Sequence, residues 1–347
     1  MPLDPSLLTR LDVRGRTVLD LPRPERGSTD EVRDTVREIV ADVRQRGDAA
    51  LLEYTRRFDR VELTSVRVPP AEAAEALAAQ PEELRRALEA AAEQITWFHE
   101  TQRRDRHRVE RRGISIEGWF QPVDRAGCYV PGGRAVYPST VLMTAIPARV
   151  AGVPEVALCV PPDASGSVPA VTLAAAAAAG VDEVYRIGGA QAIAALAYGT
   201  DSVDPVDVIV GPGNLYVAMA KQLVSGQVGV PSAFAGPSEV VVVADRSADP
   251  RLVAIDLMVQ AEHGPDGLAW LVSWDPALAD RVDAALVEAI AGAPRSDDIR
   301  ATMEASGYSV VCDGPGQAAA VANEIAPEHL QLMVDDPGSV LADIRHA

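Results

Sequence analysis

The chain has 347 residues, which is enough for two domains with cores of their own, and its acidic residues outnumber its basic residues by 18. This charge argues against a nucleic-acid partner, because phosphate binding needs a basic surface. No apolar run is long enough to span a bilayer, the N-terminus lacks the apolar core of a signal peptide, and three cysteines are too few for a disulfide framework, so we expect a cytoplasmic protein with no membrane partner.

The first third of the chain has mixed patterns. Residues 1–25 contain several prolines and no strong period, which predicts an N-terminal arm. The following pattern predicts two helices and a strand, at 28–47, 49–58 and 61–68. The arginine-rich stretch 103–112 also contains acidic residues and predicts the solvated end of a long helix that Pro81 opens. Alternating side chains predict two paired strands at 114–120 and 123–129.

From Ser139 onward, strands and helices alternate regularly. Strands are predicted at 155–160, 183–187, 206–210, 239–244, 268–273 and 308–312. Helices are predicted at 139–151, 172–179, 190–197, 215–224, 278–290 and 317–325. Such alternation gives a parallel sheet with helices on both faces, so the predicted fold class is α/β, in two halves of similar pattern.

One predicted strand runs directly into a glycine-rich turn. The strand 206–210 is followed by Gly211-Pro212-Gly213-Asn214 and then by a helix, where glycines allow close approach of a ligand and the helix N-terminus favours phosphate. Tyr216 replaces the third glycine of the dinucleotide pattern, so the turn alone fits either NAD binding or a tight connection. A similar turn stands at 188–191. Lys221, the single lysine, lies in the following helix. Either it remains by chance where other surface lysines have been replaced by arginine, or it contacts a cofactor or phosphate.

A second pattern is the end of a helix at 254–263. Gly264 and Pro265 stop this helix, and Gln260 and His263 share one of its faces because they are three residues apart. An imidazole is a good zinc ligand and an amide oxygen is a weaker one. The alternative is a polar helix terminus, where His263 is favoured near the negative end of the helix dipole.

Two further stretches contain chemically capable side chains. Glu328 and His329 follow Pro327, and adjacent side chains in an extended chain point to opposite sides, so the pair can address different atoms of one substrate in proton transfer. The alternative is a surface loop. Cys128 invites comparison with a thiol nucleophile, but no activating base adjoins it, which favours a buried structural cysteine.

Several segments together, from about Val32 to the end, resemble those of histidinol dehydrogenase and occur in that family's order. They are Gly127-Cys128-Tyr129-Val130-Pro131-Gly132-Gly133, Ile187-Gly188-Gly189-Ala190-Gln191-Ala192, Gly211-Pro212-Gly213-Asn214, Ala235-Gly236-Pro237-Ser238-Glu239, residues 254–265 and Asn323-Glu324-Ile325-Ala326-Pro327-Glu328-His329-Leu330. The resemblance implies a zinc-dependent enzyme that oxidises L-histidinol to L-histidine with two NAD, through a bound aldehyde, in the last steps of histidine biosynthesis.

The resemblance also implies a domain plan. It implies two incomplete Rossmann-like domains with parallel sheets, one inserted in the other. Residues 26–128 and 239–347 would form a discontinuous α/β domain with the metal and catalytic residues, and residues 129–238 an inserted NAD-binding domain.

Roles for individual residues follow from the same resemblance. Implied NAD contacts are Tyr129, Gln191 and Asn214; implied substrate contacts are Ser238, Gln260, His263 and His329; implied zinc ligands are Gln260 and His263; and the implied catalytic residues are Glu328 and His329. His329 would accept the hydroxyl proton, and Glu328 would activate the water that hydrates the aldehyde.

The family's pattern continues past Ala347 with two further zinc ligands, an aspartate and a histidine, with a substrate-binding glutamate, and with a segment that helps to intertwine a homodimer. Asp343 and His346 have a ligand-like spacing but do not stand in that motif. Two alternatives therefore stay open. One is an inactive relative that binds a nucleotide or an imidazole, and the other is a dehydrogenase for another zinc-chelating alcohol.

Overall fold

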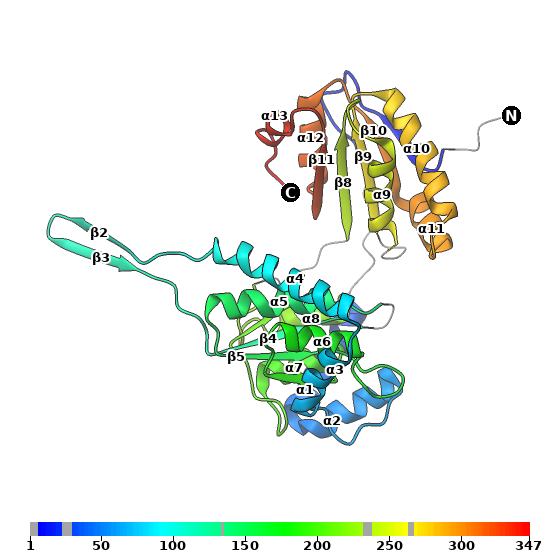
Figure 1. Cartoon of the computed structure of the whole chain (residues 1–347). Coiled ribbons are helices and arrows are strands. Elements are labelled where there is room, and N and C mark those ends of the chain that lie inside the picture. The colour runs from blue at the N-terminus through cyan, green and yellow to red at the C-terminus, as the bar shows by residue number, and fades with distance from the viewer. Residues whose placement is uncertain (1–5, 23–29, 133–134, 232–237, 263–266) are drawn as a thin grey trace. The chain divides into compact units, whose positions relative to one another are not determined.

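The computed structural model describes residues 6–22, 30–132, 135–231, 238–262 and 267–347. The chain folds into two compact units, and one is inserted into the other along the sequence (Figure 1). Residues 28–235 form the inserted unit, and residues 1–27 together with 236–347 form the discontinuous unit. Each unit contains a parallel sheet covered by helices, which confirms the predicted α/β class.

The inserted unit is built on a four-stranded parallel sheet with the strand order β6-β5-β4-β7. Its strands are β4 (Arg125–Tyr129), β5 (Glu155–Cys159), β6 (Glu183–Tyr185) and β7 (Val208–Val210). Its helices are α1 (Asp30–Arg46), α2 (Asp48–Tyr54), the π-helix η1 (Thr55–Asp59), α3 (Pro70–Ala79), α4 (Glu82–Glu100), α5 (Pro138–Ala151), α6 (Ala170–Ala178), α7 (Gly189–Tyr198) and α8 (Leu215–Val224).

Two cores lie on opposite faces of this sheet. Side chains alternate along a strand, so Tyr129 and Cys159 face one core while Cys128 and Leu158 face the other. Residues of α1, α2, α7 and α8 complete the first core, and residues of α4, α5 and α6 complete the second. Strands buried on both faces must be apolar throughout, which explains the continuous hydrophobic runs in the sequence.

The discontinuous unit has a five-stranded parallel sheet with the order β1-β10-β9-β8-β11. Its strands are β1 (Thr9–Asp12), β8 (Glu239–Ala244), β9 (Leu268–Ser273), β10 (Gly307–Val311) and β11 (His329–Met333). Its helices are α9 (Pro250–Ala261), α10 (Pro276–Ala291), α11 (Ser296–Ser306), α12 (Pro315–Ile325) and α13 (Pro337–Leu341). Here too one core joins α9, α10 and α11 to the sheet, and the other joins α12 to its opposite face.

The division between the units differs from the one that the sequence suggested. Helix α1 packs on α7 and α8, and α4 packs on α5, so residues 30–128 belong with the inserted unit rather than with residues 239–347. Strand β4 lies in the middle of the inserted sheet, and the helices before it in the chain cover that sheet. The helices α1, α2 and α4 therefore bury their apolar faces on the sheet that follows them most closely in the sequence.

Residues 103–120 contain the largest local correction. A two-stranded antiparallel hairpin is formed by β2 (His107–Arg111) and β3 (Ile114–Gly118), where the sequence predicted a helix end and a different strand pair. Residues 125–129 instead enter the parallel sheet as β4. The prediction was wrong because frequent arginines obscured the alternation in β2, and the turn at Arg112-Gly113 has both residues at positive φ, as a tight hairpin requires.

Two other predicted segments also differ. Residues 9–12, expected in an arm, form the edge strand β1, which pairs with β10. Residues 61–68, expected as a strand, form only an isolated bridge between Arg67 and Tyr185. Among the described residues, no helix is long and apolar enough to cross a membrane.

Candidate functional site

The first group of candidate residues lies at the carboxyl edge of the inserted unit's sheet. Tyr129 ends β4, and its side chain reaches across to the start of α7, where its hydroxyl oxygen accepts a hydrogen bond from the Gly189 amide at 3.0 Å. Tyr129 is only 3% exposed, and burial raises the pKa of its phenol to about 12. The phenol therefore stays protonated at neutral pH and ties two strand ends together.

The glycine turn after β7 packs against the same residue. Gly211 has a φ of +106°, and a Cβ placed on it would lie 2.0 Å from the carbonyl oxygen of Tyr129. Only glycine fits this contact, because both the backbone angle and the lack of space exclude a side chain. The turn and the end of β4 thus form one rigid edge.

Lys221 holds this turn from behind. Its side chain is 3% exposed, and its ammonium group donates a hydrogen bond to the carbonyl oxygen of Gly211. Burial lowers the pKa of this ammonium group. The sequence left open whether the single lysine is there by chance or contacts a cofactor. In the structure its buried side chain holds the turn at Gly211.

The other two residues expected at this edge, Gln191 and Asn214, differ in whether their side-chain oxygens form hydrogen bonds within the described part of the chain. Gln191 stands in the first turn of α7, is 1% exposed, and its Oε1 has no hydrogen-bond partner among the described residues. Asn214 caps α8, because its Oδ1 accepts a hydrogen bond from the Val217 amide at 3.1 Å. Helices α7 and α8 both begin at this edge, and the partial positive charge at their N-termini favours an anion there.

Asp59 is a residue that sequence reasoning missed. It ends the π-helix η1, and its Oδ2 is buried without a hydrogen-bond partner among the described residues. Burial raises the pKa of this carboxyl group to about 6, and the carboxylate in turn contributes to the raised pKa of Tyr129. No sequence motif identifies Asp59 as a candidate, because only the fold brings it near β4.

The second group of candidate residues lies at the amino edge of the discontinuous unit's sheet. Ser238 directly precedes β8, and its carbonyl oxygen accepts a hydrogen bond from Leu268 at the start of β9 at 3.0 Å. His329 begins β11 and is paired in register with Val240 of β8. Gln260 is 4% exposed and stands in the last turn of α9, which returns the chain toward the start of β9. Parallel strands therefore bring Ser238, Gln260 and His329 to one edge.

Glu328 and His329 lie closer together than the sequence suggested. A distance of 3.9 Å separates Glu328 Oε1 from His329 Nε2, and both side chains are more than half exposed. The expectation of opposite directions was wrong because Glu328 stands at a bend before the strand, after Ala326 in the left-handed conformation, so strand alternation does not yet apply. The carboxylate and the imidazole therefore lie near each other at the amino edge.

The metal prediction is only partly covered by the structure. Gln260 is described, whereas His263 lies outside the described residues. Within the described residues, no group of three or more histidine, cysteine, aspartate or glutamate side chains is arranged to hold a metal. His346 lies beside Asn323, with its Nδ1 3.3 Å from the carbonyl oxygen of that residue.

Helix ends also distinguish this edge electrostatically. Helices α9 and α12 both end at the amino edge, just before β9 and β11. The C-terminal end of a helix carries partial negative charge, which favours a cation or a protonated imidazole. This edge therefore suits the opposite sign of ligand from the carboxyl edge of the inserted unit.

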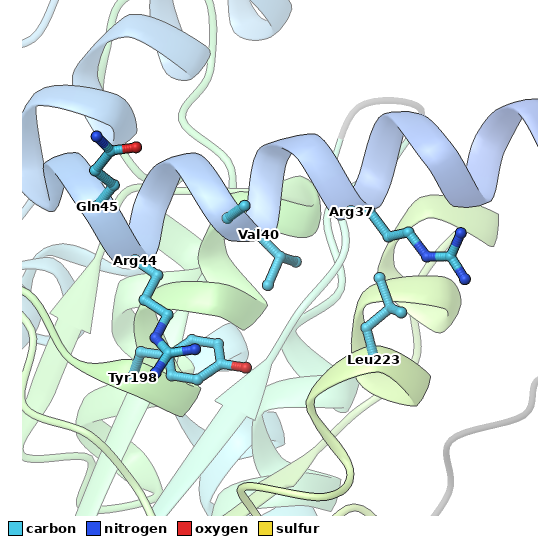
Figure 2. Close-up of a pocket in the computed structure, with 7 residues that line it drawn as sticks. Arg37, Val40, Arg44, Gln45, Tyr198 and Leu223 are labelled. Carbon is cyan, nitrogen blue, oxygen red and sulfur yellow. The ribbon is translucent and has the colours of Figure 1, made fainter.

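Two other features of the inserted unit do not belong to the candidate site. Cys128 is fully buried, and burial raises the pKa of its thiol to about 11, which confirms the prediction of a structural cysteine. A groove of about 480 Å³ lies between α1, α7 and α8 (Figure 2). In this groove the guanidinium carbon of Arg44 lies 5.1 Å from the centre of the Tyr198 ring. Tyr198 is the last residue of α7, so the groove lies at the end of α7 away from the carboxyl edge.

Comparison with known proteins shows which family the chain matches. The histidinol dehydrogenase family model matches residues 22–347. Histidinol dehydrogenase of Pseudomonas aeruginosa is 50% identical over 324 residues, which cover 92% of this chain and 73% of that protein. The enzyme of Parasynechococcus marenigrum is 48% identical over 326 residues, which cover 94% of this chain and 74% of that protein.

A solved structure agrees in fold as well as in sequence. The crystal structure of histidinol dehydrogenase from Elizabethkingia anophelis superposes with a TM-score of 0.91 at 33% identity, covering 99% of this chain and 79% of that one. Sequence, family pattern and fold agree over nearly the whole length, and the chain belongs to the histidinol dehydrogenase family of NAD-dependent oxidoreductases.

Proposed function

We propose that this chain oxidises L-histidinol to L-histidine with two NAD, by two successive hydride transfers through a bound aldehyde. The observation that carries the proposal, beside family membership, is the grouping of Ser238, Gln260 and the Glu328–His329 pair at one sheet edge. An acid–base pair at the same edge as a buried amide and a hydroxyl offers the groups that an alcohol oxidation needs.

His329 is proposed as the base. In the first step the substrate's C–O–H group loses its proton to His329 and its C–H hydride to the cofactor, which yields an aldehyde. In the second step a water molecule adds to the aldehyde, Glu328 takes a proton from that water as the C–O bond forms, and His329 returns its proton to the aldehyde oxygen, which gives the hydrate and frees His329 to act as base again. The resulting hydrate again loses a hydride, and a proton to His329, which leaves the carboxylic acid. Two cofactors are reduced for each substrate.

The cofactor fits the carboxyl edge of the inserted unit. The Gly211 turn packs tightly against the end of β4, the N-termini of α7 and α8 favour the pyrophosphate, and Gln191 has a buried oxygen, without a partner among the described residues, that can accept a hydrogen bond. We propose that Tyr129, Gln191 and Asn214 form this site, with Asn214 contributing at the start of α8. Bound NAD supplies the hydride acceptor.

Zinc is proposed at the amino edge of the discontinuous unit. Gln260 and His263 are the proposed ligands, and Gln260 is a buried amide beside the negative helix end of α9. A zinc ion there would supply a Lewis acid that helps to orient the substrate. Ser238 and His329 complete the proposed substrate contacts.

The decisive experiment measures NADH formation with L-histidinol, NAD and added zinc, beside the Pseudomonas aeruginosa enzyme as a positive control. We expect two NADH for each histidinol consumed, L-histidine as the product by mass spectrometry, and loss of turnover on adding a chelator. Turnover of another amino alcohol in preference to histidinol would replace the substrate assignment. A folded chain that neither binds nor oxidises histidinol would refute the proposal.

A further inference from the structure

Lys221 carries a buried positive charge that has no opposite charge beside it. The residue is 3% exposed and stands in the second half of α8, on a face that it shares with the buried Val217 and Val224. Its ammonium group donates a hydrogen bond to the neutral carbonyl oxygen of Gly211, and within the described residues it forms no ion pair with a carboxylate. Because removing a charge from water is costly unless an opposite charge compensates it, packing alone does not account for this lysine.

The acidic side chain that the fold brings to the same unit's sheet, Asp59, does not supply the missing charge. Burial alone lowers the pKa of the Lys221 ammonium group, and burial alone raises the pKa of the Asp59 carboxyl group. A carboxylate beside Lys221 would instead raise the pKa of the ammonium group and lower that of its own carboxyl group. The cation therefore has no counter-ion in the described part of the chain.

The charge of Lys221 is directed toward the N-terminal end of α8. Side chains of a helix point toward its N-terminus, and the hydrogen bond to Gly211 places the ammonium group behind the turn that leads into Asn214, the N-cap of α8. The N-terminus of a helix already carries about half an elementary positive charge. Lys221 therefore adds a full positive charge behind an end that favours anions.

The same turn lies where the order of strands in the inserted sheet reverses. Strands β4, β5 and β6 follow one another in one direction across the sheet, and β7 then pairs with β4 on its other side. Open α/β sheets bind nucleotides outside the carboxyl ends of the strands that flank such a reversal. Tyr129 ends β4 and Gly211 follows β7, so Lys221 stands behind the position at which this fold would hold phosphates.

Gln191 independently indicates a ligand at this edge. It is 1% exposed at the start of α7, and its Oε1 has no hydrogen-bond partner among the described residues. Tyr129 joins the two helix starts, because its hydroxyl oxygen accepts a hydrogen bond from Gly189 and its carbonyl oxygen adjoins Gly211. A buried acceptor and a buried cation, both uncompensated, require a ligand that has hydrogen-bond donors and negative charge. A nucleoside diphosphate has both.

We propose that Lys221 is a positioning residue for the cofactor, whose charge attracts the pyrophosphate through the intervening turn at Gly211, and that the pyrophosphate is the counter-ion that the chain itself lacks. This inference rests on the proposed cofactor site and adds a residue that touches no ligand. A purely structural anchor would hold the turn equally for charged and uncharged ligands. The two roles therefore differ in how the effect of Lys221 depends on the charge of the ligand.

The test compares the binding of adenosine, AMP and ADP, which differ in charge, to the full chain by isothermal titration calorimetry at low ionic strength. Lys221→Met removes the charge and keeps a side chain of similar length. We expect it to lower the affinity for ADP about tenfold, to lower the affinity for AMP less, and to leave the affinity for adenosine unchanged. Gln222→Met is the matched control at the neighbouring position of α8, and it should leave all three affinities near wild type.

A second variant keeps the test decisive if Lys221→Met folds poorly. Lys221→Arg retains the charge, so its ratio of ADP affinity to adenosine affinity should stay near the wild-type ratio even if the larger side chain weakens both. Added salt should weaken ADP binding more in the wild type than in Lys221→Met. If Lys221→Met weakens ADP and adenosine equally, or weakens neither, the inference is wrong although the cofactor site stands. A wild type that binds neither ADP nor NAD would instead refute the proposed cofactor site, and this inference with it.

Discussion

The two units share one architecture but present their candidate residues at opposite sheet edges. In the inserted unit, Tyr129 and the turns at Gly189 and Gly211 lie at the carboxyl edge, where α7 and α8 begin. In the discontinuous unit, Ser238 and His329 lie at the amino edge, where α9 and α12 end. Similar folds thus provide edges of opposite polarity, because helix N-termini favour anions and helix C-termini favour cations. The first edge therefore favours an anion, and the second favours a cation.

The largest effect is expected from removing the base at the amino edge. His329→Gln should lower kcat/KM for histidinol by about 100-fold to 10,000-fold, because proton transfer loses its acceptor. Its affinity for NAD, measured by calorimetry, should be unchanged if the two edges have separate roles. His346→Gln is the matched control in the same unit and should leave both quantities near wild type. A variant of His329 that loses NAD binding as well would contradict the separation.

Gly211→Ala should damage the carboxyl edge instead. The added Cβ would meet the Tyr129 carbonyl oxygen at 2.0 Å from a backbone with φ +106°, so we expect a loss of about 2–4 kcal/mol in the free energy of unfolding. NAD affinity should fall at least about tenfold as the turn shifts. Gly226→Ala is the control, since a Cβ there meets nothing within 4 Å. Urea unfolding and calorimetric titration with NAD measure the two effects, and equal behaviour of both variants would disprove the close contact.

Asp59→Asn should give the smallest effect, with a distinctive dependence on pH. Burial raises the folded-state pKa of Asp59 from 3.8 to about 6, so the folded state binds this proton more tightly than the unfolded state. The wild type therefore loses stability as pH rises between these two values, and the full penalty is present above about pH 6. Allowing for partial exposure, we expect the variant to be more stable by about 1–2 kcal/mol at neutral pH.

The control and the pH series decide that prediction. The gain for Asp59→Asn should shrink toward zero below about pH 4, where the wild-type carboxyl group is protonated in both states. Asp201→Asn, at an exposed position in the same unit, should change stability little at any pH. Urea unfolding across the series gives both curves. A gain that does not vary with pH would mean that the carboxylate is not the source of the penalty.

Local sequence was sufficient wherever a short segment carries its own signal. Strands such as β8 are apolar from their second residue onward because both faces are buried, and glycines and prolines mark where helices stop, so the α/β class and most element positions after Ser139 were predictable. The glycine turn at Gly211 was recognisable for the same reason. For Glu328 and His329 the sequence predicted only an extended conformation or a surface loop, and the strand β11 that begins at His329 was not predicted.

Tertiary structure alone decided what depends on partners distant in sequence. The burial of Lys221 under Gly211 and of Asp59 near Tyr129 has no local signature, because the groups that desolvate them come from other elements. The division of the chain into two units was likewise set by which sheet the helices before β4 cover. Residues 107–118 form a hairpin although their many charges obscured the strand pattern. The hydrophobic period and the composition of a segment indicate which of its own faces is buried. Which distant segments meet at a sheet edge is determined by the order of strands in the folded sheet.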